Sequence, residues 1–225
     1  MEPPRVLLST ALLRLVAGMV VIACLFFVPA GTLSYWEAWI YMGILFGSTL
    51  LIGGYLFLKD PELLERRMRT RETARPQQKI IAVFILLLLV LFLVPGIDHR
   101  YGWSQTPSAL ILLADALILL GFLLFVLTIR ENRFASRVIE VQEGQAVVST
   151  GPYALVRHPM YLAMGLVLGF SPLALGSLWG LIPSVFVPLL LAQRIAHEEQ
   201  VLKVSLPGYE EYTQRVRFRM IPFIW

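Results

Sequence analysis

Long runs of apolar residues separated by short polar segments make up most of this chain. Four such runs fall in the first 129 residues, at about 15–29, 38–58, 80–95 and 108–129. An apolar helix of about 20 residues crosses a bilayer, so each run predicts a membrane span, although the third is somewhat short. Together they predict an N-terminal set of transmembrane helices over residues 1–129.

A fifth run, residues 161–193, contains no charged residue and is too long for one crossing. As a straight helix, its 33 residues would measure about 50 Å, well beyond a bilayer core. Pro172, Gly176 and Pro183 interrupt its middle. The pattern therefore predicts a hairpin of two helices that turns near residues 172–180 and returns to the side on which it began.

Basic residues concentrate in alternate connecting segments. Arginine and lysine gather in segments 59–79, 130–158 and 194–219, whereas the opposite loops contain only Arg100 as a fixed cation. Cytoplasmic loops of membrane proteins carry an excess of Arg and Lys, so these three segments are expected on the cytoplasmic side. The chain is predicted to be an all-α integral membrane protein. It would form one membrane domain over residues 1–225, with about six transmembrane helices and both termini cytoplasmic.

Composition supports this fold class and narrows the partners. The chain of 225 residues is 57% hydrophobic and 15% charged, and its mean hydropathy of +0.72 is too high for a soluble globular protein. The net charge of +4 comes from residues that set topology, so nucleic acid is not predicted as a partner. Cys24 is the single cysteine and the three histidines are far apart, so neither a disulfide within the chain nor a metal site is predicted.

Two local features of the N-terminal half carry alternatives. In the basic segment, Asp60 before Pro61 predicts the N-terminus of a short helix. Leu63 and Leu64 would lay this helix on the membrane surface, or the segment only fixes orientation. Asp115 lies inside the fourth apolar run, where an acid is a candidate functional residue, but a hydrogen bond to a neighbouring helix is the favoured interpretation.

The most informative polar patch is GPYALVRHPMY, residues 151–161. Pro159 pushes His158 out of the helical region, so a helix is expected to begin at Pro159. Arg157 and His158 would then flank a helix N-terminus with free backbone N–H groups, which attracts anions. The alternatives are that Arg157 only anchors a helix end at the cytoplasmic interface and that His158 only caps its helix.

A second polar patch, RIAHEEQVL, covers residues 194–202. Arg194 and Glu198 are four residues apart, which places a cation and a carboxylate on one helix face. An ordinary surface ion pair is the alternative. The sequence contains no dinucleotide-binding G-x-G-x-x-G after a strand, no phosphate-binding Walker loop, no complete zincin motif and no G-x-S-x-G nucleophile elbow, which excludes the enzyme classes built on them.

The order of these motifs resembles a known family. G-x-Y, R-H-P-x-Y, R-x-x-x-E-E and the tail G-Y-x-x-Y follow one another between Asn132 and Ile224. In this combination the chain resembles the isoprenylcysteine carboxyl methyltransferase family, within the wider group that includes phospholipid methyltransferases. The chain departs from the family pattern in two places: Gln145 stands where many relatives have histidine, and Leu206, Pro207 and Gly208 stand where they have Phe-Gly in the tail.

The resemblance implies S-adenosyl-L-methionine as the cofactor, held at the cytoplasmic face by a membrane-embedded catalytic region over residues 130–225. The residues that it implies as cofactor-binding are Gln142, Gln145, Ala146, Val147, Val148, Tyr153, His158, Pro159, Met160, Tyr161 and Glu198. Arg194 would bind the methyl acceptor, so Arg194 and Glu198 are the candidate catalytic residues.

The chemistry of these side chains agrees with such roles. Arg157 and His158 suit the cofactor's carboxylate, and Glu198 can accept hydrogen bonds from a hydroxyl or an ammonium. Tyr153 and Tyr161 offer aromatic surfaces for adenine. An acceptor carboxylate needs placement but no general base, and the planar guanidinium of an arginine can orient it bidentately.

Three functions remain open at this point. The leading hypothesis is methyl transfer to the carboxylate of an isoprenylcysteine-like or other lipophilic acceptor that enters from the membrane lipids. A phospholipid-type N-methyltransferase is the alternative enzyme, and it would need Glu199 or His197 as a base. A helical membrane transporter or assembly factor that uses Asp115 is the non-enzymatic alternative. The oligomeric state is left open.

Overall fold

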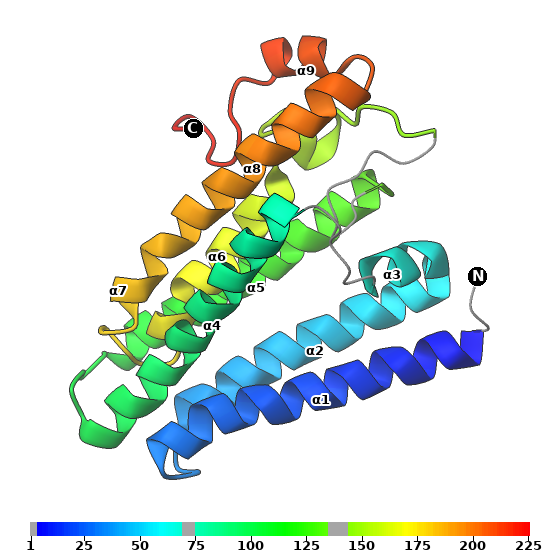
Figure 1. Ribbon diagram of the computed structural model, residues 1–225. Helices are drawn as coiled ribbons and strands as arrows, with labels where there is room; N and C mark the ends of the chain where they lie inside the picture. The colour runs from blue at the N-terminus through cyan, green and yellow to red at the C-terminus, as the bar shows by residue number, and fades with distance from the viewer. Residues whose placement is uncertain (1–3, 69–74, 135–143) are drawn as a thin grey trace.

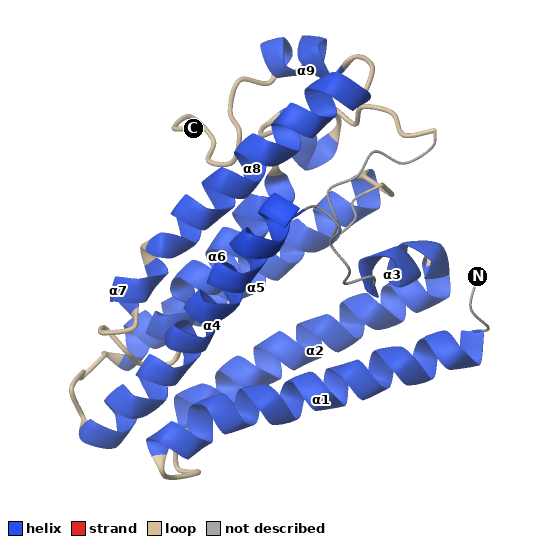
Figure 2. Ribbon diagram, viewed as in Figure 1, coloured by secondary structure: helices blue, strands red, loops and turns tan. Residues whose placement is uncertain are grey.

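The computed structural model describes residues 4–68, 75–134 and 144–225. Its regular elements are helices, and no strand occurs among the residues described (Figures 1 and 2). The elements are α1 (Pro4–Ala30), α2 (Trp36–Lys59), α3 (Pro61–Met68), α4 (Arg75–Tyr101), α5 (Ser108–Glu131), the 3-10 helix η1 (Gly151–Ala154), α6 (Pro159–Ala174), α7 (Leu181–Ser184), α8 (Phe186–Ser205) and α9 (Tyr209–Arg215). The predicted all-α class is confirmed.

Among the residues described, four helices are long and apolar enough to cross a membrane. They are α1, α2, α4 and α5, whose apolar parts have mean hydropathies of 2.6, 1.7, 2.4 and 2.9. Large apolar side chains on their outer faces are exposed, among them Leu13, Leu51 and Leu123. A surface of this kind is stable against lipid and unfavourable in water. The chain is therefore an integral, multi-pass membrane protein.

The third apolar run does not end where the sequence predicted. Pro95 lies inside α4, and the helix continues to Tyr101, so the loop expected to begin at Gly96 begins after Tyr101 instead. A Cβ added at Gly96 would lie 2.7 Å from the backbone oxygen of Phe26 on α1. The absence of a side chain at this position lets α1 and α4 pack closely, and this tertiary contact favours continuing the helix past the proline.

The last apolar run forms the predicted hairpin. α6 ends at Ala174, the chain reverses through α7, and α8 runs back beside α6. The turn is held by hydrogen bonds from Ser177 Oγ to Asp98 and, at 2.7 Å, from Thr106 Oγ1 to the Gly176 carbonyl. The prediction of a turn near residues 172–180 is confirmed. In Figure 1 the start of α6 and the end of α8 consequently lie at the same end of the molecule.

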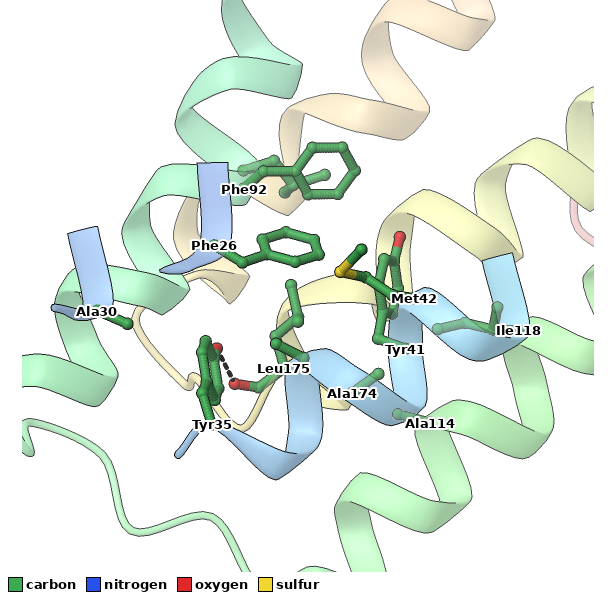
Figure 3. Packing of buried hydrophobic residues seen from close by; sticks show 12 residues of the cluster. Phe26, Ala30, Tyr35, Tyr41, Met42, Phe92, Ala114, Ile118, Ala174 and Leu175 are labelled. Atoms are coloured by element: carbon green, nitrogen blue, oxygen red, sulfur yellow. Dashed lines mark hydrogen bonds between the residues drawn. The ribbon is translucent and has the colours of Figure 1, made fainter. Parts of the chain in front are cut away.

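Aromatic side chains fill the core between α1, α2, α4 and α6 (Figure 3). Phe26 meets the ring of Phe92 edge to face, with centroids 5.5 Å apart. The Tyr35 hydroxyl donates a hydrogen bond of 2.7 Å to the carbonyl of Leu175. Because Leu175 directly follows α6, this contact fixes the turn of the hairpin against the N-terminal helices.

Asp115 is buried in α5, and neither of its carboxylate oxygens has a hydrogen-bond partner in the described part of the chain. The favoured interpretation, a hydrogen bond to a neighbouring helix, is therefore wrong. Tyr41 on α2 has a hydroxyl in the same core, but that hydroxyl pairs with Ser171 of α6 at 2.7 Å.

Helix α3 begins as predicted, with the backbone N–H of Leu63 donating to Asp60 Oδ1 at 3.1 Å. Leu63 and Leu64 are only 1% and 8% exposed, and they pack with Leu7 and Leu56 of the first two helices. The expectation that these leucines lie on the membrane surface is wrong, because the splayed ends of α1 and α2 offer them an apolar surface inside the protein.

Candidate functional site

The chain bends at Arg157, His158 and Pro159 as the sequence predicts, and we call these three residues the R-H-P corner. His158 has φ −126° and ψ 62°, and α6 begins at Pro159. The C-terminal tail runs beside this corner, because the backbone N–H of Arg157 donates to the carbonyl of Phe218 at 2.9 Å and that of His158 to Arg219 at 2.8 Å. The corner and the tail thus position one another.

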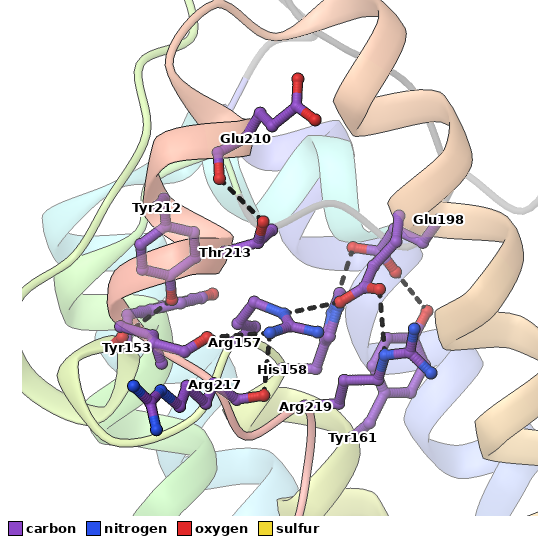
Figure 4. Close-up of polar contacts among 12 residues, drawn as sticks. Tyr153, Arg157, His158, Tyr161, Glu198, Glu210, Tyr212, Thr213, Arg217 and Arg219 are labelled. Atoms are coloured by element: carbon purple, nitrogen blue, oxygen red, sulfur yellow. Dashed lines mark hydrogen bonds and ion pairs between the residues drawn. The ribbon is translucent and has the colours of Figure 1, made fainter. Parts of the chain in front are cut away.

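The side chain of Arg157 connects the segment before α6 to α8 and to the C-terminal tail. Its Nε donates to Glu199 Oε1 of α8 at 2.7 Å, and its Nη1 donates to the carbonyls of Val216 and Arg217 at 2.8 and 2.9 Å (Figure 4). The side chain is buried. The guanidinium is therefore committed to the protein, and the expectation that it meets the cofactor's carboxylate does not fit this geometry.

Glu199 is the buried acid at the centre of the site. Besides Arg157, it accepts from Arg219 Nε at 3.1 Å and lies 3.3 Å from His158 Nε2. Burial by itself raises the pKa of the Glu199 carboxyl, but hydrogen bonds from His158 and Arg157 and their charges outweigh burial and lower it to about 2. Glu199 is thus a fixed anion. Sequence reasoning missed the role of Glu199 as the anion that connects these segments, because it considered Glu199 only as a candidate base for an amine acceptor.

Arg194 and Glu198, the two predicted catalytic residues, both form a hydrogen bond with the hydroxyl of Tyr161. Tyr161 donates its hydroxyl proton to Glu198 Oε2 at 2.6 Å, and Arg194 Nε donates to the same hydroxyl oxygen at 3.0 Å. Arg194 and Glu198 lie one turn apart on α8, as their spacing predicts, and Tyr161 reaches them from α6. The contact brings the two sequence patches together at one end of the hairpin.

Tyr153 joins α5 to the tail. Its hydroxyl accepts from Asn132 Nδ2 at 3.0 Å, and its carbonyl accepts from the Tyr212 hydroxyl of α9 at 2.8 Å. Burial raises the pKa of Tyr153 to about 12, so its hydroxyl stays protonated. The residue that was predicted as an adenine surface is therefore held in place by contacts on both sides.

The other predicted residues lie around this centre. Val147, from the segment 145–148, packs against a tail cluster made of Leu206, Tyr209, Tyr212 and Val216. Gln142 lies outside the described residues. Met160 is half-buried at the start of α6, and its Sδ is 3.8 Å from Arg67 Nη1 of α3.

Sequence reasoning missed this approach of Arg67, whose guanidinium also lies 4.6 Å from the ring centre of Phe125. The only available signal was the cluster of basic residues that includes it, and that pattern also describes an ordinary cytoplasmic loop.

Residues 109–204 match the sequence profile of the Isoprenylcysteine carboxyl methyltransferase (ICMT) family. The chain carries a domain of this family. The matched residues run from the start of α5 almost to the end of α8, so they include the R-H-P corner, Arg194 and Glu198. Members of the family are S-adenosyl-L-methionine-dependent carboxyl O-methyltransferases, and the chain is accordingly a methyltransferase that uses this cofactor. No curated protein matches the chain.

The side chains present fit S-adenosyl-L-methionine. The Glu198 side chain is 26% exposed, and its Oε1 is 3.9 Å from His158 Nδ1, beyond an ordinary hydrogen bond. One carboxylate oxygen thus keeps the capacity to accept from an ammonium or a ribose hydroxyl of the cofactor.

Proposed function

We propose that the protein methylates the carboxylate of an isoprenylcysteine-like or other lipophilic acceptor at the cytoplasmic face of the membrane. The observation that carries the proposal is the placement of Arg194 and Glu198 on one hydroxyl, that of Tyr161. A cation for an acceptor carboxylate and an acid for the cofactor lie within one contact network, at the end of an apolar hairpin. An acceptor held by Arg194 and a cofactor held by Glu198 would therefore lie close enough to react.

Each side chain then has a role in binding or orientation. The cofactor supplies a methyl group on a sulfonium, which a carboxylate oxygen attacks with cleavage of the carbon–sulfur bond. Arg194 holds the acceptor carboxylate, and Glu198 accepts from the donor groups of the cofactor. The remaining proposed contacts to the cofactor come from Gln142, Gln145, Ala146, Val147, Val148, Tyr153, His158, Pro159, Met160 and Tyr161. Alignment of two bound reactants can contribute several kcal/mol to the rate.

The state of Glu199 favours a carboxylate acceptor over an amine. An ammonium acceptor must lose a proton before it attacks, and Glu199 was one of two candidate bases. Its pKa of about 2 and its contacts with Arg157 and Arg219 make it a poor base. A carboxylate is already ionised near neutral pH and needs only to be placed.

Exposed apolar side chains near the site support a lipophilic acceptor. Leu155 precedes the R-H-P corner and is 62% exposed, and Phe223 and Ile224 in the tail are 84% and 78% exposed. Apolar residues at this level are stable in the interfacial part of a bilayer. An acceptor with an isoprenoid chain can therefore stay in the lipid while its polar end reaches Arg194.

The same proposal includes the topology. We infer that the chain crosses the membrane six times, by the four long helices and by α6 and α8. We also infer that residues 1–225 form one membrane domain and that both termini are cytoplasmic. Support comes from Figure 1, where the start of α1, α3, the start of α6 and α9 all lie toward one end. The described residues 59–68 and the basic segment 194–219 belong to that end, as the positive-inside rule requires of a cytoplasmic face.

Incubation of the purified protein with methyl-labelled S-adenosyl-L-methionine tests the acceptor. With an isoprenylcysteine carboxylate, we expect label in a product that mild base releases as methanol. The matched control is the same acceptor with its carboxylate already esterified, which should take up no label. Label in a base-stable amine of added phospholipid would overturn the carboxylate assignment in favour of N-methylation.

A further inference from the structure

The hydroxyl of Tyr161 is positioned by packing. Its ring is buried, with the side chain 8% exposed, in a cluster with Val187, Leu191, Ile195 and Met220. The ring thus has little freedom to follow either partner of its hydroxyl. The 2.6 Å contact to Glu198 is short, as expected when an O–H donates to a charged carboxylate. Any change in that contact must come from a change in charge at Glu198 or at Arg194.

The two hydrogen bonds of this hydroxyl have a fixed direction. A tyrosine hydroxyl carries one proton, and an arginine side chain only donates. Tyr161 therefore donates to Glu198 and accepts from Arg194. In such a chain each bond polarises the other, so donation by Arg194 makes the tyrosine proton a stronger donor to the carboxylate. Weakening one bond weakens the other.

We propose that Tyr161, besides its proposed contact with the cofactor, acts as a positioning residue whose hydroxyl couples acceptor binding at Arg194 to cofactor binding at Glu198. The inference rests on the proposed function, in which these two residues face the two ligands. When an acceptor carboxylate takes up the Arg194 guanidinium, the hydrogen bond to Tyr161 weakens, and so does donation from Tyr161 to Glu198. The Glu198 carboxylate is then less neutralised and holds the donor groups of the cofactor more strongly. The two ligands therefore tighten each other's binding.

Such coupling is reciprocal, because each ligand must change the affinity of the other by the same factor. It serves the reaction by favouring the complex that holds both reactants over either binary complex. An enzyme with this property keeps its methyl donor more firmly once an acceptor carboxylate is present. The direction of the coupling distinguishes this device from simple competition between two ligands for one pocket.

The coupling is measured with S-adenosylhomocysteine, the demethylated product, because it lacks the methyl group and forms a non-reacting complex with the acceptor. Its dissociation constant is determined by calorimetry with and without saturating isoprenylcysteine carboxylate. We expect the carboxylate to tighten binding by about three- to tenfold in the unmodified protein, the range of one modest hydrogen bond. The methyl ester of the same acceptor should leave the dissociation constant unchanged.

Tyr161→Phe is the test variant, and Tyr41→Phe is its matched control. Tyr41 also shares a hydroxyl contact with α6, at Ser171, and Ser171 keeps its 2.6 Å hydrogen bond to Val167 when that contact is lost. In Tyr161→Phe we expect the coupling factor to fall close to one, while both ligands still bind separately. In Tyr41→Phe the factor should match that of the unmodified protein.

The possible outcomes are distinct. Coupling that persists in Tyr161→Phe, or that is lost equally in Tyr41→Phe, overturns the role of Tyr161. Independent binding of the two ligands in the unmodified protein also overturns it and leaves the proposed function standing. If the isoprenylcysteine carboxylate fails to bind at all, the proposed acceptor is wrong, and the coupling inference falls with it.

Discussion

Arg157 and Glu199 form a buried ion pair across 42 residues of sequence, with Nε 2.7 Å from Oε1. The pair joins the R-H-P corner to the last turns of α8, and Arg157 extends the connection to the tail carbonyls. Neither residue contacts solvent to a significant extent. The pair therefore holds residues 151–161 close to residues 194–202, the two segments that contain most of the proposed site. Neither side chain is proposed to touch the reacting atoms.

Glu199→Gln should strongly destabilise the protein. The neutral amide leaves Arg157 buried without a charge partner, and breaking a buried pair in this way costs about 3 to 5 kcal/mol. Glu210→Gln is the control, because Glu210 is exposed on α9. The measurement is denaturant unfolding in detergent micelles. Equal unfolding midpoints for the two variants would show that the pair contributes nothing to stability.

The pKa of Glu199 also predicts an acid dependence. Its folded-state pKa of about 2 lies below its ordinary value of 4.5. A depressed carboxyl pKa gives stability that is fully present above pH 4.5 and is lost as pH falls toward about 2. We expect the melting temperature to decline below pH 4.5, and to decline less steeply in Glu199→Gln. Parallel declines in the two proteins would exclude Glu199 as the source.

Glu198→Gln should weaken the binding of S-adenosylhomocysteine about tenfold or more. A hydrogen bond to a charged group contributes about 1.5 to 3 kcal/mol, and the amide keeps the shape of the side chain without its charge. Arg194→Ala should instead raise the KM for the acceptor without weakening the cofactor affinity measured without acceptor. Calorimetry and initial rates separate the two effects. Equal losses of cofactor affinity would contradict the division of roles.

Two tyrosines of α9 should respond in opposite ways to loss of the hydroxyl. The Tyr209 hydroxyl is buried and has no hydrogen-bond partner within residues 4–68, 75–134 and 144–225, whereas that of Tyr212 donates to the carbonyl of Tyr153 at 2.8 Å. Tyr209→Phe removes an unsatisfied polar group, so the free energy of unfolding should stay unchanged or rise by about 1 kcal/mol. Tyr212→Phe should lower it by about 1 to 3 kcal/mol, because a buried carbonyl loses its donor. Thermal unfolding without ligand provides the comparison, and a loss in Tyr209→Phe would show that its hydroxyl has a partner in solution.

Local chemistry in the sequence was enough to predict the hairpin and its corner. An uncharged run longer than a bilayer must turn or be buried, and Pro172, Gly176 and Pro183 marked where it turns. Pro159 restricted the backbone of His158 and so predicted the start of α6. The spacing of Arg194 and Glu198 predicted their shared helix face. Each of these inferences depends on covalent geometry or helix period within a few residues.

Pairing between distant segments was not accessible in this way. The sequence marked Arg157 as a possible anion-binding group, and only the fold showed its guanidinium taken up by Glu199 and the tail. Likewise Pro95 was read as a helix end, and contact of Gly96 with α1 carried α4 beyond it.

The sequence by itself determined that this chain is a helical membrane protein and where its last hairpin turns, and it predicted the residues of the proposed methyl-transfer site. The tertiary structure alone decided which charges neutralise one another and that Tyr161 links Arg194 to Glu198. The physical reason is the separation in sequence over which each effect acts. Hydropathy and backbone restriction act along the chain, whereas a buried charge takes whichever partner the packing of remote helices brings within hydrogen-bond distance.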